Sequence, residues 1–358
     1  MNYKIYLFYL LFLFSTSNVA GQDKKIDYPV KNFELLWEAF DNHYAFFDLK
    51  NIKWEDSYKK YRRQVNDSTT NDSLFAICSR MLGELKDGHV GLSSKSSYFS
   101  AGEPANFLNN SVDSILKLID VVDSDLVKLG FTDLIQVKGN VSGKNINILE
   151  ISISSRFGYI RINSMYGISQ SKLKSTLDQA SKRFYSLEGV VIDVRFNGGG
   201  YDNYSYEIAG RFTDKKRIGH YKCVRKSSGH NDFTKLDTWY LKSKGKKQYI
   251  GPVIVLTSKI SASAADVFAL AMRQLPYVTI IGDTTYGVFS DVYESKLPNG
   301  WNYSLSNEKY FDVNMKCYEG IGITPDLLLQ NSLNDLTQKR DPVIYKAIEV
   351  LNEKIINK

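Results

Sequence analysis

The sequence predicts an α/β protein in which a small helical unit precedes a core of alternating strands and helices. Short runs of apolar, mostly β-branched residues occur at 189–194, 252–256 and 278–281, and segments with helical periodicity separate them. The 358 residues are 43% hydrophobic and 24% charged, a globular composition. The chain is therefore long enough for one large domain or two modest ones.

Residues 1–21 are typical of a secretory signal peptide. Lys4 precedes an apolar run over residues 5–14, and small residues follow, so cleavage is expected after Ala20 or Gly21. The run is shorter than the roughly 20 residues of a spanning helix. We therefore expect an exported protein, periplasmic or extracellular, without stable membrane insertion after cleavage.

Residues 22–92 are predicted to form a small N-terminal helical domain. Apolar residues recur at three- and four-residue spacing over 33–44, which predicts an amphipathic helix, and two more helices are expected over 54–61 and 71–86. An Asp-Gly pair then ends the helical pattern. A short strand beginning at His89 is expected to close this domain.

The rest of the chain divides into two parts. Residues 93–155 are rich in Ser, Asn and Gly, so a linker region with short strands is expected there. Residues 156–358 are predicted to form the α/β core, with a strand over 159–162, the three buried strands above and helices over 173–185, 204–212, 264–275 and 341–351.

Two loops that follow buried strands are the candidate sites, because ligands bind at the carboxyl ends of strands in open α/β sheets. The loop 193–200 ends in three glycines, which suit an oxyanion hole, a phosphate cradle or a flexible turn. The loop 257–266 contains Ser263, which with Asp266 fits a helix capping box. A serine at a helix N-terminus also suits nucleophilic chemistry, because the helix dipole stabilises negative charge.

A nucleophilic serine needs a base. The chain has four histidines, His43, His89, His220 and His230. His89 follows a glycine at a helix-to-strand break, where a side chain can project into a cleft. The last two lie in basic, turn-rich sequence, and position alone does not decide between the four.

Several motifs, in this order, resemble the tail-specific or C-terminal processing serine peptidases, and especially their tricorn-like branch. The helix ending in D-G-H-V, the strand that opens the core, the D-V-R-F-N-G-G-G loop and the S-A-S-A-A-D loop carry the resemblance, together with a closing stretch. They occupy residues 82–90, 159–162, 191–200, 261–266, 282–287, 297–301 and 318–326.

This resemblance implies a crotonase-like core of repeated ββα units and assigns roles to particular residues. Ser263 falls on the family nucleophile, His89 on its general base and Glu319 on the carboxylate that supports the base. The oxyanion hole falls on the N–H groups of Ala264 and Gly199, with Gly198 and Gly200 as alternatives. No cofactor and no metal are expected.

The sequence departs from the family pattern at three places. Gly88 stands where the tricorn-like site has a serine before its histidine, so the link from Glu319 to His89 must be direct, pass through water or use another side chain. Val288 stands where another branch has its lysine base. Residues 93–155 are too few for the PDZ module of many relatives, so tail recognition by a PDZ groove is not expected.

These observations predict an exported serine endopeptidase that acts on proteins or peptides through a Ser263 acyl-enzyme. The alternative is a non-catalytic peptide-binding or envelope-scaffold protein that keeps the fold. A third interpretation, a glycan- or nucleotide-handling enzyme, is supported only by the three glycines and the fold. The net charge of +7 accompanies no nucleic-acid motif, so no nucleic-acid partner is expected. Three cysteines allow at most one disulfide.

Overall fold

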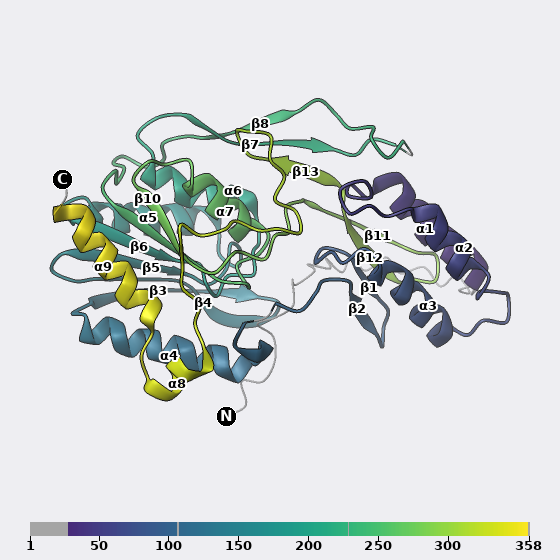
Figure 1. Ribbon diagram of the computed structural model, residues 1–358, viewed down its shortest axis with the longest axis horizontal. Helices are drawn as coiled ribbons and strands as arrows, with labels where there is room; N and C mark the ends of the chain where they lie inside the picture. Colours follow the sequence, from purple (N-terminus) through teal and green to yellow (C-terminus); the bar gives the residue numbers. More distant parts are fainter. Residues whose placement is uncertain (1–27, 106, 228, 357–358) are drawn as a thin grey trace.

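A seven-stranded sheet forms the centre of the molecule (Figure 1). The computed structural model describes residues 28–105, 107–227 and 229–356, so the predicted signal peptide lies outside the described residues. The strand order is β14-β10-β9-β6-β5-β4-β3. The strands are β3 Thr132–Val141, β4 Lys144–Ile153, β5 Phe157–Ile162, β6 Gly189–Asp193, β9 Val253–Thr257, β10 Val278–Gly282 and β14 Leu327–Leu328.

Helices cover both faces of this sheet, as the α/β class predicts. Along β6, Val190 and Ile192 pack with α5, α6 and α7, whereas Val191 packs with α4 and α9 on the other face. Strands buried on both faces must be apolar at successive positions, which explains their continuous hydrophobic runs. The helices are α4 Val112–Lys128, α5 Gln170–Phe184, α6 Asp202–Ala209, α7 Ala264–Met272 and α9 Pro342–Ile356.

The strand directions bring the two candidate loops together. Strands β5, β6, β9, β10 and β14 are parallel. At one edge β4 pairs antiparallel with β5, and β3 pairs antiparallel with β4. Since β6 and β9 are neighbours, the loops after them meet at one edge of the sheet. The N–H of Ala262 donates to the carbonyl of Asn197 at 3.1 Å, and the Ser261 hydroxyl donates to the carbonyl of Val194 at 2.8 Å.

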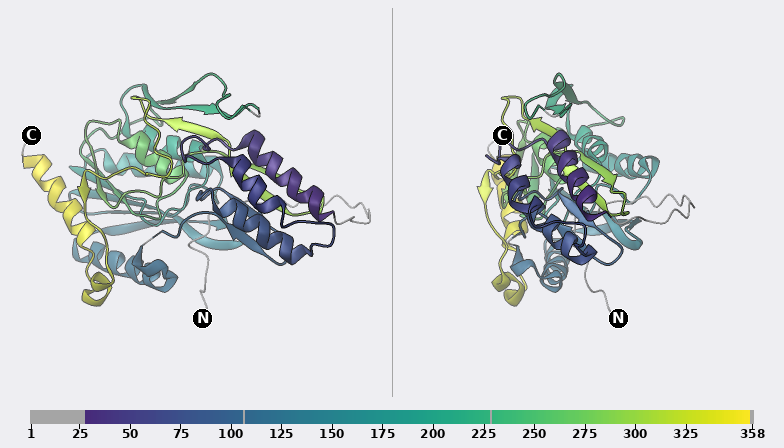
Figure 2. Two further views of the ribbon diagram at one scale, coloured as in Figure 1. Left: turned by 45° about the vertical axis from the view of Figure 1, so that its right-hand side comes forward. Right: turned by 90° about the vertical axis from the view of Figure 1, so that its right-hand side faces the viewer.

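A helical unit lies at the opposite end of the molecule from α9 (Figure 2). Its helices share one apolar core with a four-stranded sheet of order β11-β12-β1-β2, and two of these strands come from the second half of the chain. The predicted boundary at residue 92 is therefore not a structural boundary. The elements are α1 Pro29–His43, α2 Trp54–Arg62, α3 Asn71–Gly83, β1 Gly91–Ser93, β2 Tyr98–Ser100, β11 Val292–Lys296 and β12 Asn302–Ser306.

The strand expected to begin at His89 starts later. The Asp87 carboxylate accepts the backbone N–H of His89 at 2.8 Å, which places the histidine in a turn. Ladder pairing begins only at Gly91, opposite Ser304 on one side and Ser100 on the other.

The region 93–155 is more regular than the predicted linker with short strands. It contains the 17-residue helix α4 and a hairpin of two ten-residue strands, β3 and β4, which extends the central sheet. The side chain of Ser111 caps the helix by accepting the N–H of Ser114 at 3.3 Å. The boundary drawn at residue 155 therefore separates two strands, β4 and β5, that pair with each other.

A three-stranded sheet of order β13-β7-β8 lies above α6 and α7 in Figure 1. The remaining elements are short helices outside the three sheets. Among the described residues no helix is both long and apolar enough to cross a bilayer, and Cys78, Cys223 and Cys317 are free thiols. The bounds are β7 Arg217–Val224, β8 Asp237–Leu241, β13 Glu308–Phe311, α8 Leu333–Gln338, and the 3₁₀ helices Leu108–Asn110 and Gly210–Phe212.

Candidate active site

Ser263 is the residue from which helix α7 begins, and its backbone is unusual. Its φ of 56° and ψ of −119° place a non-glycine residue at positive φ, a conformation that costs free energy and is common at functional sites. The carboxylate of Asp266 accepts the Ser263 N–H at 2.8 Å and the N–H groups of Gly287 and Val288 at 3.0 and 3.1 Å. Asp266 therefore joins the serine to the neighbouring loop, beyond the helix-capping role read from the sequence.

His89 is the histidine that the fold brings to this serine. Its Nε2 lies 3.2 Å from the Ser263 Oγ, although 174 positions separate the two residues. The turn that carries it is held on both sides, because its N–H donates to Asp87 and its carbonyl accepts the Ser304 hydroxyl at 2.8 Å. The imidazole is completely buried, and burial is the main cause that lowers its pKa. A neutral imidazole at pH 7 can accept a proton.

The other three histidines lie elsewhere. His43 stacks on Tyr293, and the Nε2 of His230 lies 2.8 Å from an Asp41 carboxylate oxygen. His220 is buried between aromatic rings, and its Nδ1 lies 2.6 Å from the Tyr206 hydroxyl. Burial lowers the pKa of His220 to about 3.

Glu319 is buried in the same region but does not bond to His89. One carboxylate oxygen accepts the N–H of Phe289 at 2.7 Å, and the other lies 3.5 Å from the Lys50 ammonium. The His89 Nδ1 has no hydrogen-bond partner among the described residues. Burial, and next the charge of Asp87, raise the pKa of Glu319 to about 8, while Lys50 opposes the shift. The direct link that the sequence left open is thus absent from the described structure.

The glycine loop lies beside the serine. Gly199 has a φ of 112°, and a Cβ built on it would lie 2.7 Å from the Ser263 Cβ. Its N–H, however, donates to the Asn197 side-chain oxygen at 2.8 Å. Gly199 was predicted as an oxyanion donor, and in this structure an Asx turn uses its N–H. Gly198 and Gly200, the predicted alternatives, line the same cleft as Ser263.

These groups open into a cleft of about 820 Å³. One wall carries His89, Ser263 and the glycines. Away from them the lining becomes polar around Arg161, which is buried and bonds to the carboxylates of Glu150 and Asp123 at 2.6 Å each. The cleft is large enough for several residues of an extended peptide.

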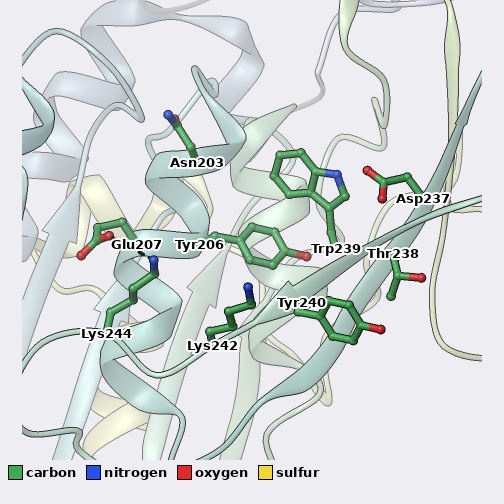
Figure 3. Close-up of a pocket in the computed structure, with 9 residues that line it drawn as sticks. All are labelled: Asn203, Tyr206, Glu207, Asp237, Thr238, Trp239, Tyr240, Lys242 and Lys244. Atoms are coloured by element: carbon green, nitrogen blue, oxygen red, sulfur yellow. Dashed lines mark ion pairs between the residues drawn. The ribbon is translucent and has the colours of Figure 1, made fainter.

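A second hollow of about 400 Å³ lies between α6 and β8 (Figure 3). Its lining includes none of the predicted site residues. Lys244 lies 3.9 Å from the carboxylate of Glu207 there. Among the described residues no group of three or more His, Cys, Asp or Glu side chains is arranged to hold a metal.

Sequence reasoning missed four residues that build the site: Tyr44, Lys50, Asp87 and Asn197. Asp87 and Asn197 had a usable signal, since each stands two positions before a residue whose N–H it accepts. Tyr44 directly follows the first helix and Lys50 lies in the turn after it, and nothing in their local sequence indicates the contact.

A serine at a helix N-terminus, a histidine within reach of its hydroxyl and an adjacent glycine loop define the class of serine hydrolases. Residues 156–329 match the model of peptidase family S41, and residues 30–83 match that of the tricorn protease C1 domain. The chain therefore belongs to peptidase family S41, as its motifs predicted.

Individual relatives agree with this assignment. The crystal structure of a candidate peptidase from Parabacteroides merdae is 33% identical, with a TM-score of 0.77 over 91% of this chain and 97% of that chain. The tricorn protease of Thermoplasma acidophilum is 23% identical over 91% of this chain and 35% of that protein. The carboxy-terminal processing protease CtpB of Bacillus subtilis is 29% identical over 48% of this chain and 34% of that protein. The matched parts thus span about a third of these two curated relatives.

Proposed function

We propose that the protein is an exported serine endopeptidase that cleaves proteins or peptides through an acyl-enzyme on Ser263. The observation that carries the proposal is the 3.2 Å approach of the His89 Nε2 to the Ser263 Oγ within a peptide-sized cleft. Export rests on the pattern of residues 1–21. A secreted chain that begins at residue 21 or 22 by mass spectrometry is the expected result, and retention of the full N-terminus would contradict it.

In the proposed reaction the His89 Nε2 accepts the Ser263 proton as the Oγ attacks the peptide carbonyl. This role requires that the remaining imidazole proton sits on Nδ1. The charged imidazole then gives its proton to the leaving amine, and water hydrolyses the ester. The lowered pKa of His89 supports this role, because the base is unprotonated before the reaction.

The oxyanion would be stabilised by backbone N–H groups. Ala264 supplies the first, at the start of α7, and Gly198 or Gly200 supplies the second because the Gly199 N–H is held by Asn197. One such donor is worth about 3–4 kcal/mol in the transition state. Glu319 is buried near the turn that carries His89, and because burial raises its pKa to about 8 it would act there mainly as a neutral carboxyl group.

Fluorophosphonate labelling tests the proposal directly, because the reagent reacts with an activated serine. We expect label on the wild type, none on Ser263→Ala and at least a 100-fold slower reaction with His89→Ala. Ser164→Ala is the matched control, since Ser164 lines the same cleft. An unlabelled wild type, or equal labelling of Ser263→Ala, would favour the non-catalytic peptide-binding alternative.

A further inference from the structure

Lys50 places one ammonium group among four oxygen atoms at the base of the turn that carries His89. It belongs to the turn after α1, and its side chain is only 15% exposed. Its Nζ donates to the carbonyls of Leu85 and Lys86 at 3.1 and 3.0 Å. The same atom lies 3.5 Å from a Glu319 oxygen and 3.9 Å from an Asp87 oxygen.

Asp87 connects this ammonium to His89. Its carboxylate is buried, and one oxygen accepts the backbone N–H of His89 at 2.8 Å and the Ser306 hydroxyl at 3.2 Å. The other oxygen accepts the Tyr44 hydroxyl at 3.0 Å and faces Lys50. Asp87 therefore holds the main chain of the histidine, and its position depends on the groups around its second oxygen.

Glu319 also approaches the Lys50 ammonium. Its oxygen nearest Lys50 has no hydrogen-bond partner among the described residues, so the ammonium at 3.5 Å is the polar group that approaches it. The other oxygen is fixed by the N–H of Phe289. The connection from Glu319 to the His89 turn thus passes through Lys50 and Asp87.

We propose that Lys50 is a positioning residue of the site, whose ammonium ties Glu319 to Asp87 and so fixes the turn that carries His89. This inference rests on the proposed function and answers how Glu319 is coupled to His89 with Gly88 in place of a serine. A buried carboxylate such as Asp87 is unfavourable unless a cation or hydrogen bonds compensate it, and Lys50 also opposes the burial that raises the pKa of Glu319. Removal of the ammonium would leave Asp87 held only by its hydrogen bonds from His89, Ser306 and Tyr44, and would leave its charge unbalanced beside the imidazole.

The surrounding charges set the direction of the effect on His89. Asp87 and Asp291 raise the pKa of His89 and Lys50 lowers it, against the larger lowering caused by burial. Loss of Lys50 should therefore raise the His89 pKa. The titratable groups that act on His89 or Glu319 from the packed elements are Asp87, Lys50, Asp291, Asp266, Tyr44 and Tyr286.

The test compares Lys50→Met with Lys50→Arg and with Lys86→Met. Lys86 is the matched control, because its own ammonium is 70% exposed and pairs with exposed Glu103 nearby. NMR titration of the four histidines, in a Ser263→Ala background, measures the His89 midpoint without any need for activity. The pH profile of kcat/KM on a peptide substrate is measured in parallel with Ser263 intact.

For Lys50→Met we expect the His89 midpoint to rise, because a cation that lowers it is lost. The acidic limb of kcat/KM should shift the same way. At pH 7, kcat/KM should fall roughly tenfold because the histidine is displaced from the serine, not because it is protonated at that pH. Lys50→Arg should stay within about threefold of wild type, since it keeps the charge, and Lys86→Met should change neither measurement. If Lys50→Met does not fold, Lys50→Gln carries the same expectation, because its amide can still donate to the two carbonyls.

An unchanged His89 midpoint in a folded, less stable Lys50 variant would overturn the proposal and leave Lys50 a purely structural residue. Equal damage by Lys50→Arg and Lys50→Met would overturn it as well. Absence of fluorophosphonate label on Ser263 would instead remove the proposed peptidase function. The NMR titration would still report on the coupling, so the two failures can be told apart.

Discussion

At the scale of single residues, the space around the nucleophile is set by Gly199. A Cβ on this residue would lie 2.7 Å from the Ser263 Cβ and 2.8 Å from the Ala262 carbonyl oxygen, closer than real Cβ contacts. Its φ of 112° is also one that L side chains rarely adopt. By contrast, a Cβ on Gly198 would meet no atom within 4 Å. A side chain is therefore excluded at Gly199 but has space at the adjacent Gly198.

We expect Gly199→Ala to lower kcat/KM, or the rate of fluorophosphonate labelling, by about 100-fold, because a displacement of about 1 Å at a nucleophile has effects of that size. Gly198→Ala is the control and should stay within about threefold of wild type. Thermal unfolding verifies that both variants are folded. Comparable activity of the two variants would show that close packing at residue 199 does not matter.

Short-range turns of the site could have been predicted from the sequence. Asp87, Asp193 and Asn197 each accept the N–H of the residue two positions later, which is the ordinary behaviour of Asx turns. The long-range result of those turns could not. That the Gly199 N–H is consumed, and that Lys50 approaches Asp87, depends on how distant segments pack.

At the scale of elements, the loop after β6 is fixed to α9 through Arg195. The Arg195 side chain is 1% exposed, donates to the Asp193 carboxylate at 2.7 Å and lies 2.8 Å from a carboxylate oxygen of Asp341. Burial of three charges is favourable only when the pairing and hydrogen bonds are complete. The glycine loop that follows Arg195 thus takes its position from the end of β6 and the start of α9.

Removal of this cation should cost far more than removal of an exposed one. Arg195→Met should lower the free energy of unfolding by about 3–5 kcal/mol, because two buried carboxylates lose their partner. Arg156→Met is the matched control, since Arg156 and Glu188 are 44% and 43% exposed, and it should cost only a small fraction of that loss. Urea denaturation measures both, and equal losses would refute the argument.

The element scale is also where sequence reasoning was weakest. The buried strands β6, β9 and β10 were predicted because both faces are covered and the apolar runs are continuous. The β3–β4 hairpin was missed because the half next to its turn is exposed and polar. Only the second half of β4 therefore carries a strong apolar signal. Helix α4 was missed for a related reason, as its apolar residues alternate with six charged ones.

At the scale of the whole molecule, the site joins two units. Ser263 belongs to the central α/β core, while His89 belongs to the helical unit that packs on β11 and β12. Local sequence patterns contain no information about contacts 174 positions apart. The pairing of these residues was predictable only through the resemblance to a family. How Glu319 is connected, by contrast, could be read only from the packed structure.

The joined units also bury several carboxyl groups at a cost. Burial raises the pKa of Asp202 and Asp266 to about 7 and that of Glu319 to about 8. A carboxyl group whose pKa is raised by folding binds its proton more tightly in the native state than in the unfolded chain. Its contribution to stability is full below the unfolded pKa, near 4.5 for Glu319, and is lost as the pH rises to about 8.

We therefore expect the contribution of Glu319 to stability to fall between about pH 4.5 and pH 8, and Glu319→Gln to remove this component. The amide oxygen of glutamine can still accept the N–H of Phe289, so the fold should be retained. The free energy of unfolding of the variant minus that of wild type should therefore be higher at pH 8.5 than at pH 5, by of the order of a few kcal/mol. Urea denaturation of both proteins across this range measures the difference. If the free energies of unfolding of the two proteins change with pH in the same way, the raised pKa of Glu319 is contradicted. If the variant becomes less stable than wild type at high pH, ionised Glu319, held by Lys50, stabilises the native state.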